Sequence, residues 1–125
     1  MRLLLDTHIF CWSFYERQRL SQYAQRLMTE ADEVFVSSAS IWEIAIKSRL
    51  GKIDADPQEL FQQIRLNGFQ ELPVWSRHAL AAATLPLHHT DPFDRLLLAQ
   101  AFLEPLRFVT VDGALAAYGG GIEFL

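Results

Sequence analysis

Two short apolar runs in this chain of 125 residues each end in an aspartate, and this placement constrains the fold more than any other feature. The first run opens the chain and is closed by Asp6, and the second run, Phe108–Val111, is closed by Asp112. A continuous apolar run of this length is typical of a strand that is covered on both faces. Two further acids, Glu43 and Asp94, lie within apolar segments that we expect to be helical.

Short apolar runs alternate with segments of helical spacing along the whole chain. We expect strands over 3–5, 34–36, 69–74, 108–111 and 122–125. We expect helices within 7–15, from 21 to 31, from the serines at 37–40 to about 50, from 57 to 66, from about 76 to 85, from 92 to about 103, and a short one after 113. This alternation predicts an α/β fold of three layers, with a central, mostly parallel sheet of about four or five strands flanked by helices. The length predicts a single domain over residues 1–125.

The predicted sheet brings the acids toward one edge. Ligands of parallel α/β sheets bind beyond the carboxyl ends of the strands, so Asp6 and Asp112 meet there if their strands are neighbours. Glu43 and Asp94 lie near the starts of helices that begin at the same edge. Like charges held close together repel and raise one another's pKa, whereas Mg²⁺ or Mn²⁺ binds to oxygen ligands and keeps them ionised. Because such a cation also acidifies a bound water, the pattern favours hydrolysis of a phosphodiester.

Each acid also has a structural explanation that the sequence leaves open. Asp6 and Asp91 have the position of helix N-caps, and Asp112 begins an Asp-Gly turn. Glu43 has the third position of a capping box, and Asp94 suits the positive end of a helix dipole. Neighbouring His88 and His89 suggest a zinc site, but adjacent histidines rarely share one ion, so we expect an ordinary loop there.

Composition excludes several classes of protein. The net charge of −4 excludes binding of RNA or DNA by phosphate neutralisation alone, so we expect a metal ion or a local basic strip of Lys47, Arg49 and Lys52 to contribute. The single cysteine, Cys11, excludes an intrachain disulfide and fits the reducing cytoplasm, where we place the protein. We predict no membrane association, because no apolar run approaches the ~20 residues needed to span a bilayer.

Four segments of the chain carry a family resemblance, in order and with family-like spacing. They are Leu4–His8, Ser40–Lys47 with Leu50–Ile53, Leu85–Leu87 with Asp91–Ala101, and Val109–Asp112. Together they resemble the PIN-domain family, above all its VapC branch of ribonuclease toxins from bacterial toxin–antitoxin pairs. The resemblance implies an endoribonuclease that needs Mg²⁺ or Mn²⁺ to cleave RNA. It also implies a homodimer and a cognate antitoxin whose C-terminal segment covers the acidic pocket.

The resemblance assigns roles to individual residues. Asp6, Glu43, Asp94 and Asp112 match the family's acidic positions, which implies that they are the catalytic residues and the metal ligands. Asp91 is an added carboxylate that is common in this branch, although we expect it to cap a helix.

Three neighbours of these acids are further candidates. Thr7 and Thr110 either support the metal ligands or have only a structural role. Arg95 either clamps a phosphate or ties Asp91 to its helix.

Other functions remain open at this stage. A phosphoacceptor signalling domain also gathers acids at strand ends, but it needs an acidic pair after the first strand and a late lysine, which this chain lacks. A non-catalytic RNA-binding or assembly module on the same scaffold would be expected to have lost acids from the cluster. A DNA structure-specific nuclease shares the chemistry but usually carries extra helical segments.

Overall fold

The sheet is parallel throughout and has the strand order β3-β2-β1-β4-β5 in a computed structural model that describes residues 1–125. The strands are β1 (Arg2–Leu5), β2 (Glu33–Ser37), β3 (Gln70–Leu72), β4 (Arg107–Thr110) and β5 (Ile122–Phe124). The predicted α/β fold around a mostly parallel sheet is therefore confirmed, with five strands.

The helices lie where the spacing of apolar residues predicts them, except for an unpredicted 3-10 turn at Arg17–Arg19. They are α1 (Thr7–Tyr15), η1 (Arg17–Arg19), α2 (Gln22–Glu30), α3 (Ser38–Arg49), α4 (Pro57–Leu66), α5 (Ser76–Thr84), α6 (Pro92–Leu103) and η2 (Gly113–Tyr118). The side chains of Ser21, Asp56 and Asp91 accept hydrogen bonds from first-turn amides of α2, α4 and α6, which is why these three starts are readable from the sequence. None of the helices has both the length and the apolar character that crossing a bilayer requires.

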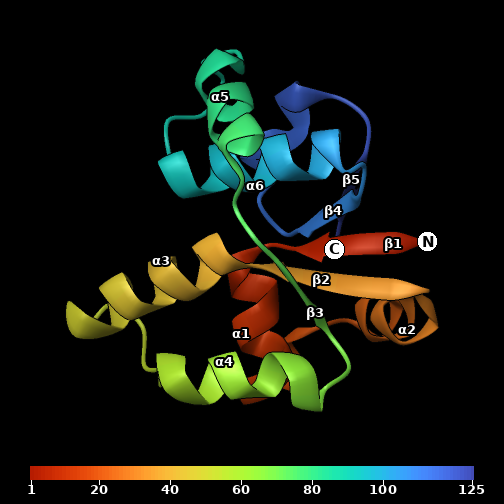
Figure 1. Cartoon of the computed structure of the whole chain (residues 1–125). Coiled ribbons are helices and arrows are strands. Elements are labelled where there is room, and N and C mark those ends of the chain that lie inside the picture. Colours follow the sequence, from red (N-terminus) through yellow and green to blue (C-terminus); the bar gives the residue numbers. More distant parts are fainter.

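Two apolar layers lie on opposite faces of the sheet. Successive side chains of a strand point to opposite faces, so Leu3 and Leu5 pack toward α1, α2 and α4, whereas Leu4 packs toward α6 and η2. All three leucines are fully buried. Figure 1 shows the resulting layers, with α1, α2 and α4 below the sheet and α5 and α6 above it.

The strand order reverses between β1 and β4. The chain passes from β1 outward to β2 and β3, then returns through α5 and α6 to β4 on the other side of β1. Such a reversal leaves a crevice at the carboxyl ends of the two strands. Leu5 is in register with Val109, and the backbone N–H of Asp6 donates to the carbonyl of Val109 at 2.9 Å. The residues that follow β1 and β4 are therefore neighbours, which meets the condition under which Asp6 and Asp112 come together.

A buried arginine on α6 holds the connection between α5 and α6. The Arg95 side chain donates to four backbone carbonyls, those of Ala82, Leu85, Pro86 and His89, at 2.8–3.4 Å. Arg95 is only 8% exposed. Both predictions for this residue are wrong, because carbonyls rather than Asp91 occupy its donors and burial withdraws it from a phosphate.

The hydroxyl of Tyr118 at the end of η2 completes this restraint. It donates to the carbonyl of Pro86 at 2.7 Å and accepts from the N–H of His89 at 3.0 Å. The connection before α6 is thus fixed by side chains from two later elements, although it contains no regular secondary structure.

We predict that Arg95→Lys lowers the free energy of unfolding by about 1–3 kcal/mol, because a single ammonium cannot satisfy carbonyls that a planar guanidinium reaches together. Urea denaturation followed by circular dichroism measures the change. Arg77→Lys is the matched control, because Arg77 is exposed and pairs with Glu104 at the surface. Equal losses in the two variants would contradict the role assigned to Arg95.

Candidate active site

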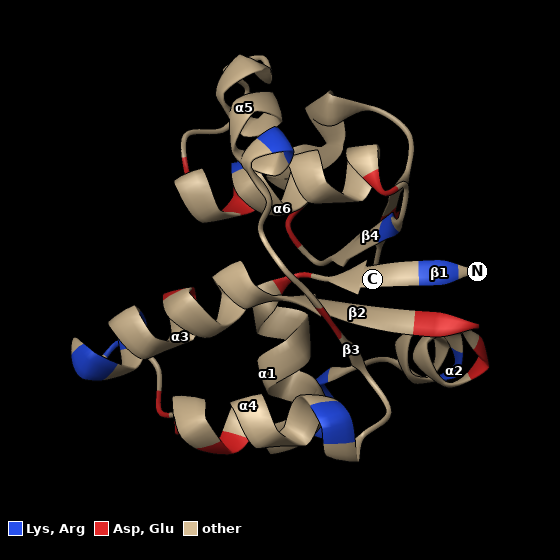
Figure 2. Ribbon diagram, in the orientation of Figure 1, with Lys and Arg blue, Asp and Glu red and all other residues tan.

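Carboxylates from four parts of the chain gather at the edge where β1 and β4 end. Asp6 follows β1, Asp112 follows β4, Glu43 lies in α3 and Asp94 lies in the first turn of α6. Figure 2 shows acidic positions in red on α3, on α6 and just beyond β1. The charges of Asp6 and Glu43 both raise the pKa of Asp94, so the three carboxylates act on one another.

Thr110 links the two acids that follow the strands. Its hydroxyl donates to Oδ2 of Asp6 at 2.6 Å and accepts from the N–H of Asp112 at 3.0 Å. Asp6 is 4% exposed. Burial raises its pKa, although the hydrogen bond from Thr110 and the charge of His8 oppose this rise. Thr110 therefore orients the Asp6 carboxylate.

Thr7, the other candidate threonine, is buried at the start of α1. It donates to the hydroxyl of Ser40 on α3 at 2.9 Å. Thr7 thus joins α1, which follows Asp6, to α3, which carries Glu43, and its hydroxyl has no hydrogen bond to a carboxylate.

Glu43 lies in the middle of α3 and is almost completely buried, with 2% exposed. Its Oε2 accepts from Nζ of Lys47 at 2.5 Å, and its Oε1 has no hydrogen-bond partner. The helix is capped by Ser37, whose hydroxyl accepts from the N–H of Ala39 at 3.0 Å. The capping-box explanation for Glu43 is therefore wrong, and its burial needs another cause.

Lys47 provides the positive charge that partly balances the acids. Burial alone would lower its pKa, but the hydrogen bond to Glu43 and the charges of Glu43, Asp91 and Asp94 raise it. Lys47 is thus paired with Glu43 among the acids, so it is not part of a free basic strip as predicted. Arg49 and Lys52 remain exposed.

Asp94 is the acid whose ionisation the environment opposes most clearly. Burial, followed by the charge of Asp6, raises the pKa of Asp94 to about 6, and the charges of Asp91 and Glu43 add to this effect. Asp91 has the predicted capping role, because its Oδ1 accepts from the N–H groups of Phe93 and Asp94 at 2.8 and 3.1 Å.

His89 belongs to the site, although no pattern in the sequence points to it directly. Its Nε2 lies 2.7 Å from Oδ2 of Asp94 and 4.0 Å from Oδ2 of Asp112. His88 instead packs its ring against Tyr118, with ring centroids 5.1 Å apart. The expectation of an ordinary loop thus describes His88 but not His89. The one available signal was that this loop leads into α6 at the acidic edge.

The donor atoms suit a divalent cation. His89, Asp94 and Asp112 offer ligand atoms that all lie within 4.8 Å of one another. The unpartnered Oε1 of Glu43 is a buried acceptor that a cation would satisfy. Carboxylate oxygens are the ligands that Mg²⁺ and Mn²⁺ prefer.

Nucleophilic chemistry at the cysteine is excluded by its environment. Cys11 is buried in the core, as predicted. Burial, together with the charges of Glu43 and Asp6, raises the pKa of its thiol to about 12. The thiol therefore stays protonated, and reactivity needs the thiolate.

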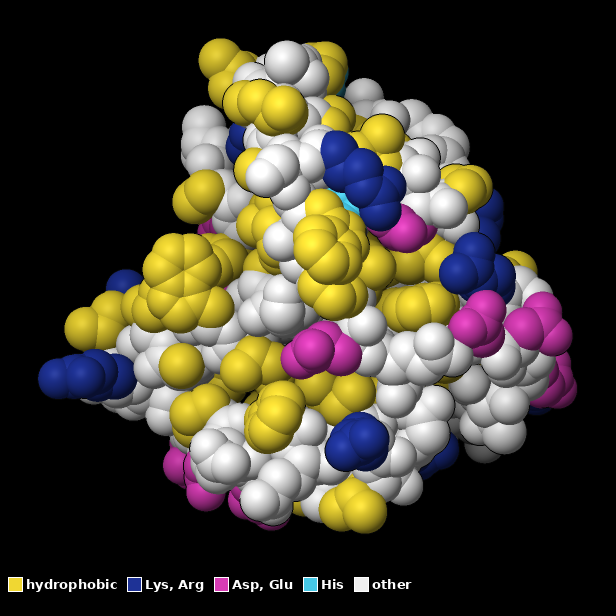
Figure 3. Space-filling model, viewed as in Figure 1, with side chains coloured by type: hydrophobic (Ala, Val, Ile, Leu, Met, Phe, Trp, Pro, Cys, Tyr) yellow, Lys and Arg dark blue, Asp and Glu magenta, His cyan; other side chains and the backbone are white.

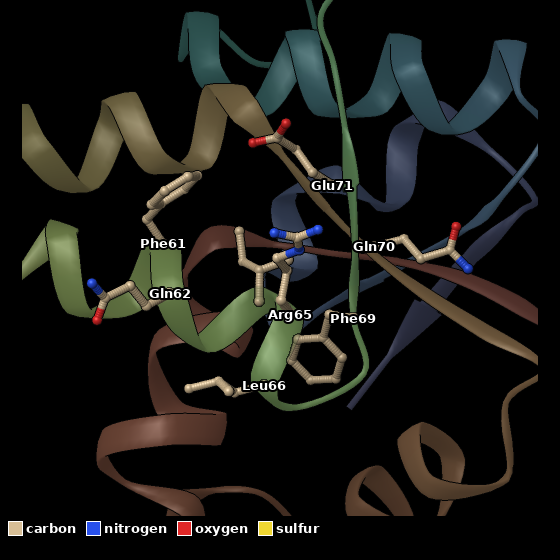
Figure 4. A pocket seen from close by; sticks show the side chains of 8 residues that line it. Phe61, Gln62, Arg65, Leu66, Phe69, Gln70 and Glu71 are labelled. Atoms are coloured by element: carbon tan, nitrogen blue, oxygen red, sulfur yellow. The ribbon is translucent and has the colours of Figure 1, made fainter.

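A hollow of about 740 Å³ lies away from these acids between α4 and β3 (Figure 4). Its lining comprises Phe61, Gln62, Ile64, Arg65, Leu66, Phe69, Gln70 and Glu71. It contains none of the four candidate acids, so the candidate site is defined by its chemistry rather than by cavity size.

Comparison with known proteins agrees with this geometry. The family model described as PIN domain matches residues 3–121. Ribonuclease VapC22 of Mycobacterium tuberculosis is 33% identical over 123 residues, which cover 93% of this chain and 91% of that protein.

Solved structures share the fold at lower identity. VapBC2 from Rickettsia felis, bound to a DNA fragment from its promoter, has a TM-score of 0.72 at 15% identity, with 100% of this chain and 99% of that chain covered. A toxin–antitoxin complex from Klebsiella pneumoniae has a TM-score of 0.69 at 20% identity, with 97% and 95% covered. The extent of the family match, together with the VapC relative, shows that this chain belongs to the PIN-domain family, in its VapC branch.

Proposed function

We propose that this chain is a metal-dependent endoribonuclease that hydrolyses RNA phosphodiester bonds and is the toxin of a toxin–antitoxin pair. One observation carries the proposal: a buried carboxylate, Glu43, keeps an oxygen without a partner, and burial and the charge of Glu43 both raise the pKa values of Asp6 and Asp94. Such an arrangement is unfavourable unless a cation binds there. The 33% identity to a protein named as a ribonuclease supports RNA as the substrate.

Asp6, Glu43, Asp94 and Asp112 are the residues that would hold the cation. When bound, a divalent cation supplies positive charge for the phosphate oxygens and makes a bound water more acidic at neutral pH. Thr110 keeps Asp6 in one orientation, and Asp91 fixes the start of α6 and therefore the position of Asp94. Lys47 lowers the net negative charge that an approaching phosphodiester meets.

We expect Asp6→Asn and Asp94→Asn each to lower metal-dependent RNA cleavage by about a hundredfold or more, because each removes a negative oxygen ligand while keeping the shape of the side chain. Cleavage of an end-labelled RNA in Mg²⁺, in Mn²⁺ and in chelator measures this effect. Asp54→Asn is the matched control, because Asp54 is exposed and has no ion pair.

Parent-like cleavage by both site variants would refute the assignment. Binding of RNA without any cleavage by the parent would instead favour a non-catalytic RNA-binding module.

Asp94→Asn also changes the stability of the metal-free protein. The pKa of Asp94 is raised in the fold, to about 6, so ionisation of Asp94 costs stability as the pH rises from about 4, its unfolded value, through 6. We predict that Asp94→Asn in chelator raises the Tm at pH 8, by about 4 °C for each kcal/mol of repulsion relieved. The gain shrinks toward zero as the pH falls to about 4. Differential scanning calorimetry across this range tests the sign, and a lower Tm at pH 8 would contradict it.

The proposal includes two protein partners, a second copy of the chain and a cognate antitoxin. Large apolar side chains are exposed near two helices. Trp42 lies on α3 and Leu50 directly follows it, whereas Leu80 lies on α5 and Leu87 is in the segment after it. Figure 3 shows such side chains over both helices. Exposed apolar area of this kind often marks a protein interface. The structural neighbours include toxin–antitoxin complexes, which supports an antitoxin as the second partner.

We predict a dimer of the purified chain, which sedimentation equilibrium measures directly. Co-expression with the product of the adjoining reading frame is expected to yield a stable complex in which RNA cleavage is suppressed. A monomer at all concentrations would refute the homodimer, and an adjoining product that neither binds nor inhibits would refute the antitoxin assignment.

A further inference from the structure

One nitrogen donor lies within a site that is otherwise made of carboxylates. We propose that His89 is a ligand of the metal site, binding the cation through Nε2 together with Asp94 and Asp112. This inference rests on the proposed metal-dependent function and deepens it, because it concerns which cation the site prefers.

The spacing of the donor atoms suits a shared ion. Two ligands with bonds of about 2.1 Å lie about 3 Å apart when adjacent on an octahedral ion and about 4.2 Å apart when opposite. Nε2 of His89 is 2.7 Å from Oδ2 of Asp94 and 4.0 Å from Oδ2 of Asp112. Both separations lie near this range, so small shifts of the side chains would let the three groups hold one cation in place of the hydrogen bond between His89 and Asp94.

The backbone holds His89 at this position. Its N–H donates to the hydroxyl of Tyr118, and its carbonyl accepts from Arg95 on α6. Asp94 lies on the same helix as Arg95, one residue earlier, so the histidine and the aspartate are fixed to one element. A ligand site needs such restraints, because a loosely held side chain pays an entropic cost when it binds.

A second observation points to a ligand at the same place. Glu43 is almost completely buried, its Oε1 has no hydrogen-bond partner, and its charge acts on Asp94. A buried acceptor that no group of the protein satisfies thus lies close enough to Asp94 for its charge to raise the pKa of that residue. A cation near Asp94 would supply the missing interaction.

A nitrogen ligand changes the preference of the site for metals. Mg²⁺ favours oxygen ligands and octahedral geometry, whereas imidazole binds more strongly to transition metals. We therefore infer that the site binds Mn²⁺ more tightly than Mg²⁺ and that His89 is responsible for a large part of the difference. A site made of carboxylates alone would discriminate less between the two ions.

Pulsed electron paramagnetic resonance of the Mn²⁺-loaded protein tests the ligand directly. In a nitrogen-free buffer, the parent is expected to show modulation from a directly bound ¹⁴N nucleus, and His89→Gln is expected to lose it. His89→Gln keeps a donor that can reach Asp94, and the backbone contacts of residue 89 are unaffected. His88→Gln and His8→Gln are the matched controls, because one is the adjacent histidine and the other follows Asp6 closely; both are expected to keep the modulation.

Affinity measurements give a second readout that does not depend on RNA cleavage. Titration calorimetry is expected to show that His89→Gln weakens Mn²⁺ binding by about tenfold or more while changing Mg²⁺ binding much less. Absence of nitrogen modulation in the parent, or its persistence in His89→Gln, would overturn the proposal. So would an equal loss of affinity for both ions.

These results separate the inference from the proposed function. A protein that binds Mn²⁺ through His89 but cuts no RNA would refute the ribonuclease assignment and leave the ligand in place. A protein that cleaves RNA but shows no nitrogen ligand would refute the role of His89 and leave the ribonuclease assignment in place.

Discussion

Buried negative charge at the reversal of strand order is the constraint on which the site depends. β1 and β4 are neighbours in the centre of the sheet, so the acids that follow them are adjacent whatever the surrounding helices do. Asp6 is buried there, and α3 and α6 add Glu43 and Asp94. Concentrated like charge of this kind opposes folding, and it persists in proteins where it is needed for function.

The surrounding residues reduce this cost without removing it. Lys47 pairs with one oxygen of Glu43, Thr110 donates to Asp6, and His89 lies within hydrogen-bond distance of Asp94. Each of these three acids thus has at least one compensating neighbour, while the pKa values of Asp6 and Asp94 remain raised. The negative charge of the acids is therefore only partly compensated, and a bound cation would compensate the rest.

The sequence predicts the sheet and its acidic edge because both depend on local patterns. Continuous apolar runs mark the central strands, and caps such as Asp56 and Asp91 mark the helix starts. The positions of Arg95 and His89 could not be predicted in this way. Arg95 reaches carbonyls up to 13 residues earlier in the chain, and His89 turns toward Asp94 only because Arg95 and Tyr118 fix its backbone. The cap of the helix that carries Glu43 is also not predictable, because serines at 37, 38 and 40 offer the same capping chemistry and spacing alone does not select Ser37.

The buried thiol of Cys11 has a practical consequence. Because it is the single cysteine of the chain and stays protonated within the core, maleimides and similar thiolate-directed reagents have no native target in the folded protein. A cysteine introduced at an exposed position such as Leu66, which is 76% exposed, would be the sole attachment point for a spin or fluorescent label. The molecule is thus ready for distance measurements without prior removal of its native cysteine.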